Sequence, residues 1–330
     1  MKRWLLTLAL STLLLLVACS DAKTKQITLA EVTRSLFYTP QYVALEKGFF
    51  TEEGLDVELE TTWGGDKTMT ALLSGHADIA LVGSETSVYV HAQDASDRII
   101  NFAQLTQTDG TFLVSKEAIE DFTWEDVRGE VFLGQRKGGM PQMIGEFVLK
   151  KNGIDPHEDL EELIQHIDYA NIPSSFVSGE AKFVQLFEPT ASVFEKEGKG
   201  HVVASFGEES GTIPYTVYMA KESMLDKDQE TIEKFTRAIY KAQQWVAETD
   251  ASEIANVIEP YFDDSSMDIL IDSIERYKAQ ASFAPDPILK EESWDHLLKI
   301  MDDAGELRQD APYDELVNTE IAESIMAEDK

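Results

Sequence analysis

Short apolar runs alternate with segments of helical period from Ile27 onward, and this alternation limits the possible folds more than any other feature of the chain. Residues 27–32, 57–61 and 79–82 have the length and apolar content of strands, and helical segments separate them. A strand, helix, strand order requires right-handed crossovers between parallel strands. The pattern therefore predicts an α/β fold whose sheets are mostly parallel and flanked by helices.

Cap and turn residues predict where the first helices begin and end. Thr39 and Pro40 are expected to supply the N-cap and first residue of a helix that ends at Gly48. Asp66 is expected to cap the next helix, and Gly75 to close it.

The start of the chain has the pattern of an export signal. Lys2 and Arg3 precede an apolar run over residues 4–18. The run is shorter than the about twenty apolar residues that span a bilayer, so residues 1–18 are predicted to be a signal peptide.

Cys19 follows that run and is the only cysteine in the chain. The four residues that end at it, Leu-Val-Ala-Cys, resemble the lipobox of bacterial lipoproteins. The resemblance implies cleavage before Cys19, a diacylglycerol on its thiol, and a domain held at the outer face of the cell membrane. Residues 19–26 are then the lipidated cysteine and its tether, and with no free thiol left, disulfides are excluded.

The formal net charge of −33 at pH 7 narrows the range of partners. Such a surface repels nucleic-acid phosphates and anionic lipid, so neither is an expected partner of the folded domain. The six histidines lack the paired spacing of a zinc site. We expect a monomer with no metal and no cofactor.

A short pattern occurs twice in the sequence. Residues 74–79 are Ser-Gly-His-Ala-Asp-Ile, and residues 178–183 are Ser-Gly-Glu-Ala-Lys-Phe. Each copy follows a strand and helix and leads through apolar residues to a helix start, at Ser84 and at Glu188. The repetition predicts two similar lobes that face each other.

Helix starts beyond the carboxyl ends of strands are the expected ligand positions in such a fold. Three starts supply the candidate binding residues Ser84, Glu85, Thr86, Lys137, Gly138, Gly139 and Glu188. Hydroxyls and carboxylates at these positions either cap the helix or bind solute. The glycines either let a ligand approach the backbone or form a turn.

Further candidates follow the first predicted strand and lie near the crossings between lobes. Phe37 and Tyr38 either form flat apolar walls of a site or pack the first helix onto the sheet. Tyr215 lies on the predicted returning segment, and Gln104 precedes the first crossing. Arg34 pairs either with an anionic solute or with one of the many acidic side chains.

Several motifs carry a family resemblance in their order along the chain. Residues 37–50, Phe-Tyr-Thr-Pro-Gln-Tyr-Val-Ala-Leu-Glu-Lys-Gly-Phe-Phe, and residues 53–57, Glu-Gly-Leu-Asp-Val, resemble the opening of solute receptors of ABC importers. The chain is similar more narrowly to the NMT1/THI5-like group, which contains nitrate, sulfonate, taurine and thiamine-pyrimidine receptors. Leu-Phe-Glu-Pro at 186–189 and Gly-Thr-Ile-Pro-Tyr-Thr at 211–216 fit that group.

The resemblance implies a two-lobed fold of the periplasmic-binding-protein type II class. Two crossing strands join the lobes, which close over a small solute and present it to a membrane permease with its ATPase. We expect residues 27–107 to form the first part of lobe 1 and residues 108–211 to form lobe 2. Residues 212–330 complete lobe 1 and add the C-terminal helices.

The candidate residues leave two solute classes open. Glu85 and Glu188 would accept hydrogen bonds from an amino-heterocycle such as an aminopyrimidine-type thiamine precursor. A nitrate, taurine or alkanesulfonate anion would prefer Arg34 and Lys137. The acids favour the heterocycle slightly.

A second class of function is an exported enzyme, either a hydrolase or a protein related to pyrimidine synthesis. A hydrolase would need a nucleophile, and no Gly-x-Ser-x-Gly elbow occurs in the sequence. We therefore favour a receptor that binds without turnover.

Overall fold

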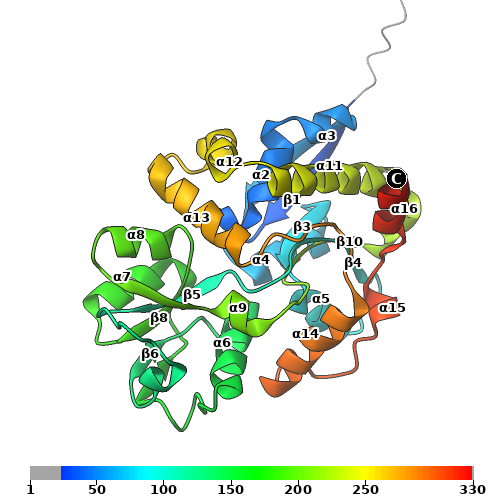
Figure 1. The fold of residues 1–330 in the computed structure, drawn as a ribbon. Helices are drawn as coiled ribbons and strands as arrows, with labels where there is room; N and C mark the ends of the chain where they lie inside the picture. Colours follow the sequence, from blue (N-terminus) through cyan, green and yellow to red (C-terminus); the bar gives the residue numbers. More distant parts are fainter. Residues whose placement is uncertain (1–23, 329–330) are drawn as a thin grey trace, which may run out of the picture.

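The computed structural model describes residues 24–328, which form two lobes that each contain a five-stranded sheet (Figure 1). The strands are β1 (Lys25–Glu31), β2 (Leu55–Thr61), β3 (Ile79–Gly83), β4 (Ile99–Thr106), β5 (Thr111–Ser115), β6 (Val131–Leu133), β7 (Glu162–Ile164), β8 (Phe183–Phe187), β9 (His201–Ser205) and β10 (Thr216–Lys221). The predicted cleavage site, Cys19 and most of the tether lie outside the described residues.

Helices cover both sheets. The α-helices are α2 (Thr39–Glu46), α3 (Phe49–Glu52), α4 (Gly65–Ser74), α5 (Glu85–His91), α6 (Met140–Lys151), α7 (Ile172–Ser178), α8 (Thr190–Lys196), α9 (Phe206–Ser210), α10 (Glu222–Lys227), α11 (Gln229–Glu248), α12 (Ala251–Ile258), α13 (Met267–Ala279), α14 (Glu291–Asp303), α15 (Tyr313–Leu316) and α16 (Glu320–Glu328). Short 3-10 helices are η2 (Leu36–Tyr38), η3 (Trp124–Val127), η4 (Tyr169–Asn171) and η5 (Glu259–Tyr261). Between residues 24 and 328, no helix is both long and apolar enough to cross a membrane.

The two sheets have the same strand plan. The orders are β2-β1-β3-β10-β4 and β7-β6-β8-β5-β9. In the first sheet only β10 runs against its neighbours, and in the second only β5 does. The predicted α/β class with mostly parallel sheets is confirmed.

The repeated Ser-Gly-x-Ala pattern occupies equivalent places in the two sheets. Residues 74–79 lead into β3, which lies between β1 and β10. Residues 178–183 lead into β8, which lies between β6 and β5. The two copies of the pattern therefore precede strands that hold the same position in the two sheets.

The chain passes between the sheets twice, and the two passages lie side by side. The first runs from β4 to β5, and the second runs from α9 to β10. The amide of Ile213 donates to the carbonyl of Gln107 at 3.0 Å, and that of Tyr215 donates to the carbonyl of Thr106 at 3.2 Å. The amide of Gln107 donates in turn to Ser282 at 2.9 Å. These bonds join both crossings to the segment after α13 (Figure 1).

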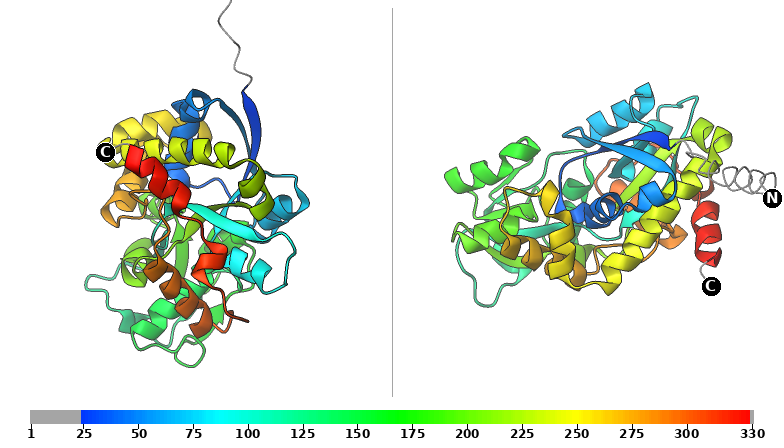
Figure 2. Two further views of the ribbon diagram at one scale, coloured as in Figure 1. Left: turned by 90° about the vertical axis from the view of Figure 1, so that its right-hand side faces the viewer. Right: turned by 90° about the horizontal axis from the view of Figure 1, so that it is seen from above.

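The C-terminal helices contact both lobes. Helix α11 packs on α2 and α3, and α16 packs on α11, all around the first sheet (Figure 2). Helix α13 contacts α8, and α14 contacts α6. Helices α6 and α8 flank the second sheet. Trp294 of α14 is fully buried, and its indole N–H donates to the carbonyl of Ala311 at 2.9 Å.

Two predicted N-caps are wrong. The helix predicted to start at Thr39 is preceded by η2, where the Ser35 hydroxyl accepts from the amide of Phe37 at 3.2 Å. Thr39 instead donates to the carbonyl of Leu36 at 2.6 Å. Helix α4 begins at Gly65, so Asp66 lies inside its first turn rather than at its cap. Gly75 closes α4 as predicted, with a left-handed φ of 75°.

Candidate functional site

Glu85 joins the two lobes at the start of α5. This helix follows β3 directly, so its first turn lies beyond the carboxyl end of a parallel strand. Glu85 Oε1 accepts a hydrogen bond of 3.3 Å from the amide of Met140, the first residue of α6 in the other lobe. A helix N-terminus carries unsatisfied amides and a partial positive charge, so it favours a carboxylate at this point.

The Glu85 side chain is only 5% exposed. Burial raises the pKa of the Glu85 carboxyl to about 7, although the bonds from the backbone amides of Glu85 and Met140 act in the opposite direction. Its second oxygen, Oε2, is buried without a hydrogen-bond partner among the described residues. Oε2 is therefore an acceptor that is free to bind a further group.

The lobes meet again one turn further along α5. The Tyr89 hydroxyl donates to the carbonyl of Gly138 at 3.3 Å. Gly139, the next residue, is the N-cap of α6. A cavity of about 330 Å³ lies beside this contact, lined by Tyr89, Ala92, Gln93, Gly138, Glu306 and Arg308.

Ser84 and Thr86 flank Glu85, but their hydroxyls bond to the backbone. The Ser84 hydroxyl donates to the carbonyl of Pro214 on the returning crossing. The Thr86 hydroxyl donates to the carbonyl of Gly83 at 2.7 Å. Both residues therefore fix α5 against the strands and the crossing.

Phe37 is the centre of an aromatic cluster between the lobes. Its ring is 1% exposed and lies 5.3 Å from the rings of both Tyr215 and Tyr277, and 5.9 Å from that of Phe187 at the end of β8. Gly110, on the first crossing, lies under this ring, because a Cβ built there would lie 2.7 Å from a Phe37 ring carbon. The cluster therefore draws residues from both lobes and both crossings.

Tyr38 and Tyr169 extend the cluster from opposite lobes. The Tyr38 ring is 6.2 Å from that of Phe37, and the Tyr169 ring is 6.0 Å from that of Phe187. Burial raises the pKa of the Tyr38 hydroxyl well above its usual value, and Tyr169 and Glu85 also contribute to the rise. Tyr169 is one of the few large apolar side chains with a substantial exposed area, 42%.

Asp109 lies on the first crossing, and Tyr215 lies close to it on the second. Asp109 is fully buried, and its Oδ1 accepts from the amide of Thr111 at 2.6 Å and also from the Thr111 hydroxyl. Burial raises the pKa of the Asp109 carboxyl to about 6, and Thr111 and Tyr215 oppose the rise. Neither Asp109 Oδ2 nor the Tyr215 hydroxyl has a hydrogen bond of normal geometry within residues 24–328.

Arg34 is used inside the first lobe. Its guanidinium lies 3.0 Å from the buried carboxylate of Glu31 and donates to Thr61 at 3.1 Å. It also lies over the rings of Tyr42 and Tyr261, 5.4 and 5.0 Å from their centroids. Among the described residues, Arg34 thus pairs with an acid of its own lobe.

Two further candidates lie apart from the aromatic cluster. The Lys137 side chain is exposed, while its amide donates to the carbonyl of Gln165 at 3.3 Å. The carbonyl of Gln104 on β4 accepts from the Gln243 side chain of α11 at 2.8 Å. The side-chain oxygen of Gln104 is buried without a hydrogen-bond partner among the described residues.

Glu188 is engaged by its own helix and by α13. Its carboxylate accepts from the amide and the hydroxyl of Ser192, at 2.9 and 3.0 Å. Arg276 donates to the same carboxylate at 2.7 Å and also pairs with Glu195. Burial raises the pKa of the Glu188 carboxyl, but the Arg276 charge opposes this. Among the described residues, the Glu188 carboxylate thus binds the first turn of α8 and Arg276.

Several residues of this region were missed by the sequence reasoning. Asp109, Tyr169, Phe187 and Arg276 all contact the cluster or its acids. A signal existed for Asp109, since an Asp-Gly pair in the crossing that joins two lobes marks a turn close to the expected site. Arg276 had none, because it lies 88 residues from Glu188 in the sequence.

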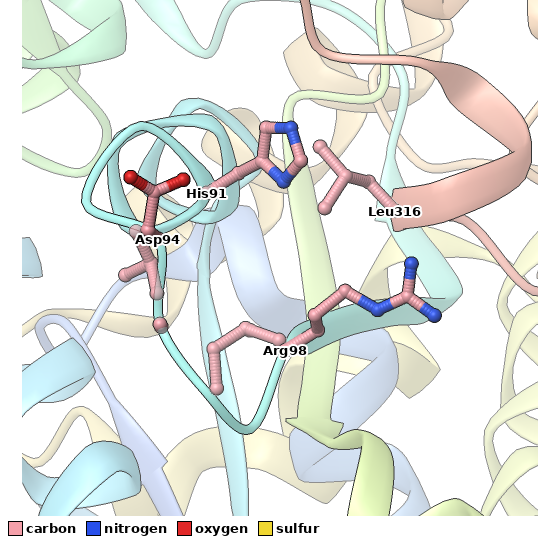
Figure 3. Close-up of a pocket in the computed structure, with 7 residues that line it drawn as sticks. His91, Asp94, Arg98 and Leu316 are labelled. Atoms are coloured by element: carbon pink, nitrogen blue, oxygen red, sulfur yellow. The ribbon is translucent and has the colours of Figure 1, made fainter.

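A separate surface cavity of about 240 Å³ lies at the far end of α5 and is lined by Val90, His91, Asp94, Ala95, Arg98, Ile99 and Leu316 (Figure 3). Its lining includes Ile99, the first residue of β4, so the cavity lies toward the amino end of that strand, whereas Glu85 follows the carboxyl end of β3. The Arg98 guanidinium turns away from Asp94 and pairs with Glu222 and Glu315 (Figure 3). The Arg98 charge is therefore engaged within the protein, and Asp94 and His91 are the other polar side chains of the lining.

Comparisons with known proteins now define the class of the chain. A family model described as "NMT1/THI5 like" matches residues 37–251. A protein of Bacillus subtilis (strain 168), named "Putative binding protein YtlA", is 60% identical over 314 residues, covering 95% of this chain and 94% of that protein. The chain belongs to the NMT1/THI5-like family.

Solved structures of low sequence identity share the fold. The ligand-binding component of an ABC-type import system from Staphylococcus aureus, with zinc bound, has a TM-score of 0.73 at 16% identity, covering 91% of this chain and 99% of that one. The nitrate-binding protein NrtA from Synechocystis PCC 6803 has a TM-score of 0.71 at 15% identity, covering 93% and 89%. In residues 24–328 of this protein, no group of three or more His, Cys, Asp or Glu side chains is arranged to hold a metal.

Proposed function

We propose that this protein is the solute receptor of an ABC importer, held outside the cell membrane through a lipid on Cys19. Membership of the NMT1/THI5-like family and the two-lobed fold support the receptor class. The observation that carries the proposal is the set of residues from both lobes around Phe37. A second contact between the lobes supports it, the hydrogen bond of 3.3 Å from the amide of Met140 to the Glu85 carboxylate.

Each lobe is proposed to move as a unit. Lobe 1 consists of residues 27–107 and 212–330, and lobe 2 consists of residues 108–211. The two crossings, near residues 107–110 and 211–215, are the hinges. The α5 to α6 contacts then form only when the lobes close, because they join groups on opposite sides of both crossings. Closure over a solute presents one defined surface to a permease and its ATPase.

Binding without turnover fits the chemistry of the candidate residues. The Ser84 hydroxyl is occupied by a backbone carbonyl, and the Glu188 carboxylate is occupied by Arg276 and Ser192. The enzyme alternative gains no specific support from either group. The remaining proposed contacts, Phe37, Tyr38, Glu85, Gly138, Gly139 and Tyr215, serve affinity and closure.

The anchor is compatible with the position of the first strand. The amino end of β1 lies on the side of the first lobe away from the second lobe (Figure 1). A tether from this point leaves the space between the lobes open to solute.

A screen of small solutes by thermal unfolding tests the receptor proposal. A true ligand raises the melting temperature in a concentration-dependent way, by RT ln(1 + [L]/Kd) in free energy. The screen should contain amino-heterocycles and also nitrate, taurine and alkanesulfonates. If no compound of either class stabilises the protein, the proposed function is wrong.

A further inference from the structure

Five carboxylates are buried among the described residues, and they differ in what balances their charge. Glu31, Glu146 and Glu188 each lie within 3.5 Å of an arginine or histidine side chain. No basic side chain of residues 24–328 pairs with the remaining two, Glu85 and Asp109. A buried carboxylate without a counter-charge is costly, so such a group binds a proton readily.

The burial of Glu85 depends on the opposite lobe. Its Oε1 accepts from the amide of Met140 at 3.3 Å, and one turn further along α5 the Tyr89 hydroxyl donates to the carbonyl of Gly138 at 3.3 Å. Both partners belong to residues 108–211. When the lobes part, these groups leave and water reaches the Glu85 carboxylate.

The Glu85 side chain folds back over Gly83, at the end of β3. A Cβ built on Gly83 would lie 2.7 Å from the Glu85 carboxyl carbon and closer still to Oε2. The backbone amides of Glu85 and Met140 favour the charged form, and burial opposes it more strongly. Oε2, which has no hydrogen-bond partner among the described residues, is the oxygen left for a proton.

Three tyrosines face Glu85 from the elements packed around it. They are Tyr38 of η2, Tyr89 of α5 itself and Tyr215 of the second crossing, and the Glu85 charge acts on all three hydroxyls. Burial raises the pKa of each hydroxyl above its usual value. The three tyrosines therefore stay neutral near pH 7.

Two pairs of charged residues lie further out. Arg136 and Lys137 precede α6 and are exposed. Glu306 and Arg308 follow α14, have opposite charges and line the neighbouring cavity of about 330 Å³. No member of either pair is among the groups that shift the pKa of the Glu85 carboxyl. Glu85 is thus the titrating group at this contact between the lobes.

We propose, building on the receptor function, that closure of the lobes takes up one proton on Glu85, so that the lobes close more readily as the pH falls through neutrality. In the closed form Oε2 carries the proton, while Oε1 still accepts from the amide of Met140. When the lobes part, the solvated carboxyl releases the proton to water.

Proton linkage gives the sign and the size of the effect. Burial in the closed form raises the pKa of the Glu85 carboxyl from its ordinary value of 4.5 to about 7. The solvated open form keeps the ordinary value, so between these two values the closed form binds more protons and a falling pH favours it. From pH 8.5 to pH 6 the ratio of closed to open molecules should rise by about 10-fold.

Small-angle scattering of the full mature chain at pH 6 and pH 8.5, without solute, tests the proposal. We expect the wild-type radius of gyration to be smaller at pH 6. Glu85→Gln keeps an acceptor for the Met140 amide but cannot ionise, so it should have the smaller radius at both pH values. Gly83→Ala keeps the acid, but its Cβ displaces the carboxylate from its place, so this second variant should also lose the pH dependence.

Two control variants should respond to pH as the wild type does. Glu180→Gln removes an exposed glutamate charge. Histidines also change charge near neutral pH, and the His296 ring of α14 lies 5.6 Å from that of Phe147 on α6, so His296→Gln tests this other contact between the lobes.

An equal radius of gyration for the wild type at both pH values overturns the inference. A pH dependence that persists in both Glu85→Gln and Gly83→Ala also overturns it. Because the experiment uses no solute, either result leaves the receptor function to be decided by the solute screen. At pH 8.5 the lobes are apart more often, so a solute that closes them still lowers the radius of gyration.

Discussion

Asp109→Asn should make the ligand-free protein more stable at neutral pH. Burial raises the pKa of the Asp109 carboxyl from 3.8 to about 6. A shift of this size, roughly two units at 1.36 kcal/mol per unit, means that holding the charged form buried costs about 3 kcal/mol. The asparagine keeps the acceptor for Thr111 and removes the charge.

The sign of the pH dependence follows from linkage. In the unfolded chain the carboxyl loses its proton near pH 3.8, whereas in the folded protein it keeps the proton up to about pH 6. The unfolding free energy therefore falls as the pH rises through this window, and the full cost applies above it. Wild type and Asp109→Asn should be equally stable below pH 3.8 and differ by about 3 kcal/mol at pH 8.

Thermal unfolding across this pH range is the assay. For a chain of this length, about 3 kcal/mol corresponds to a melting temperature about 5 °C higher for the variant at pH 8. Asp263→Asn, which removes an exposed charge, controls for the general effect of reducing a large negative charge. A variant that is destabilised at pH 8, or whose gain is the same at pH 3.5 and pH 8, refutes the reasoning.

Other changes test the anchor and the packing between the lobes. Cys19→Ser should release the protein into the medium, and unchanged partition into detergent would contradict the lipid anchor. Gly110→Ala should lower the unfolding free energy by about 1–3 kcal/mol in urea, because the new Cβ meets the buried Phe37 ring at 2.7 Å; an unchanged midpoint refutes this contact. Arg276→Met should cost about 3–5 kcal/mol by leaving Glu188 unpaired, with much of the loss recovered on adding Glu188→Gln; if the double variant is as unstable as Arg276→Met, the pairing is not the cause.

The sequence predicted the fold well because strand and helix periods are local properties. The strands expected at residues 27–32, 57–61 and 79–82 overlap β1, β2 and β3, and the helix expected to close at Gly75 is α4. The cap at Thr39 failed for a local reason as well, since η2 precedes α2 and takes up the Ser35 hydroxyl in its own cap.

The candidate site was only partly predictable, because partners distant in sequence decide which polar groups remain free. Glu85 and Tyr215 were separate candidates, and the amide of Ser84 donates to the carbonyl of Tyr215 at 3.2 Å, so the start of α5 lies beside the returning crossing. Arg34 looked available for an anion, but the buried Glu31 at the end of β1 takes its charge. Asp109 lies in an Asp-Gly turn sequence, and only the packing around it shows that its carboxylate is fully buried.

The central claim is that two lobes close over a solute, and small-angle scattering with and without saturating ligand tests it most directly. The ligand is the compound that stabilises the protein most in the screen of small solutes. We predict a smaller radius of gyration on binding, with a stoichiometry of one, since the α5 to α6 contacts through Glu85 and Tyr89 form on closure. A radius of gyration that stays the same at saturation would contradict the account.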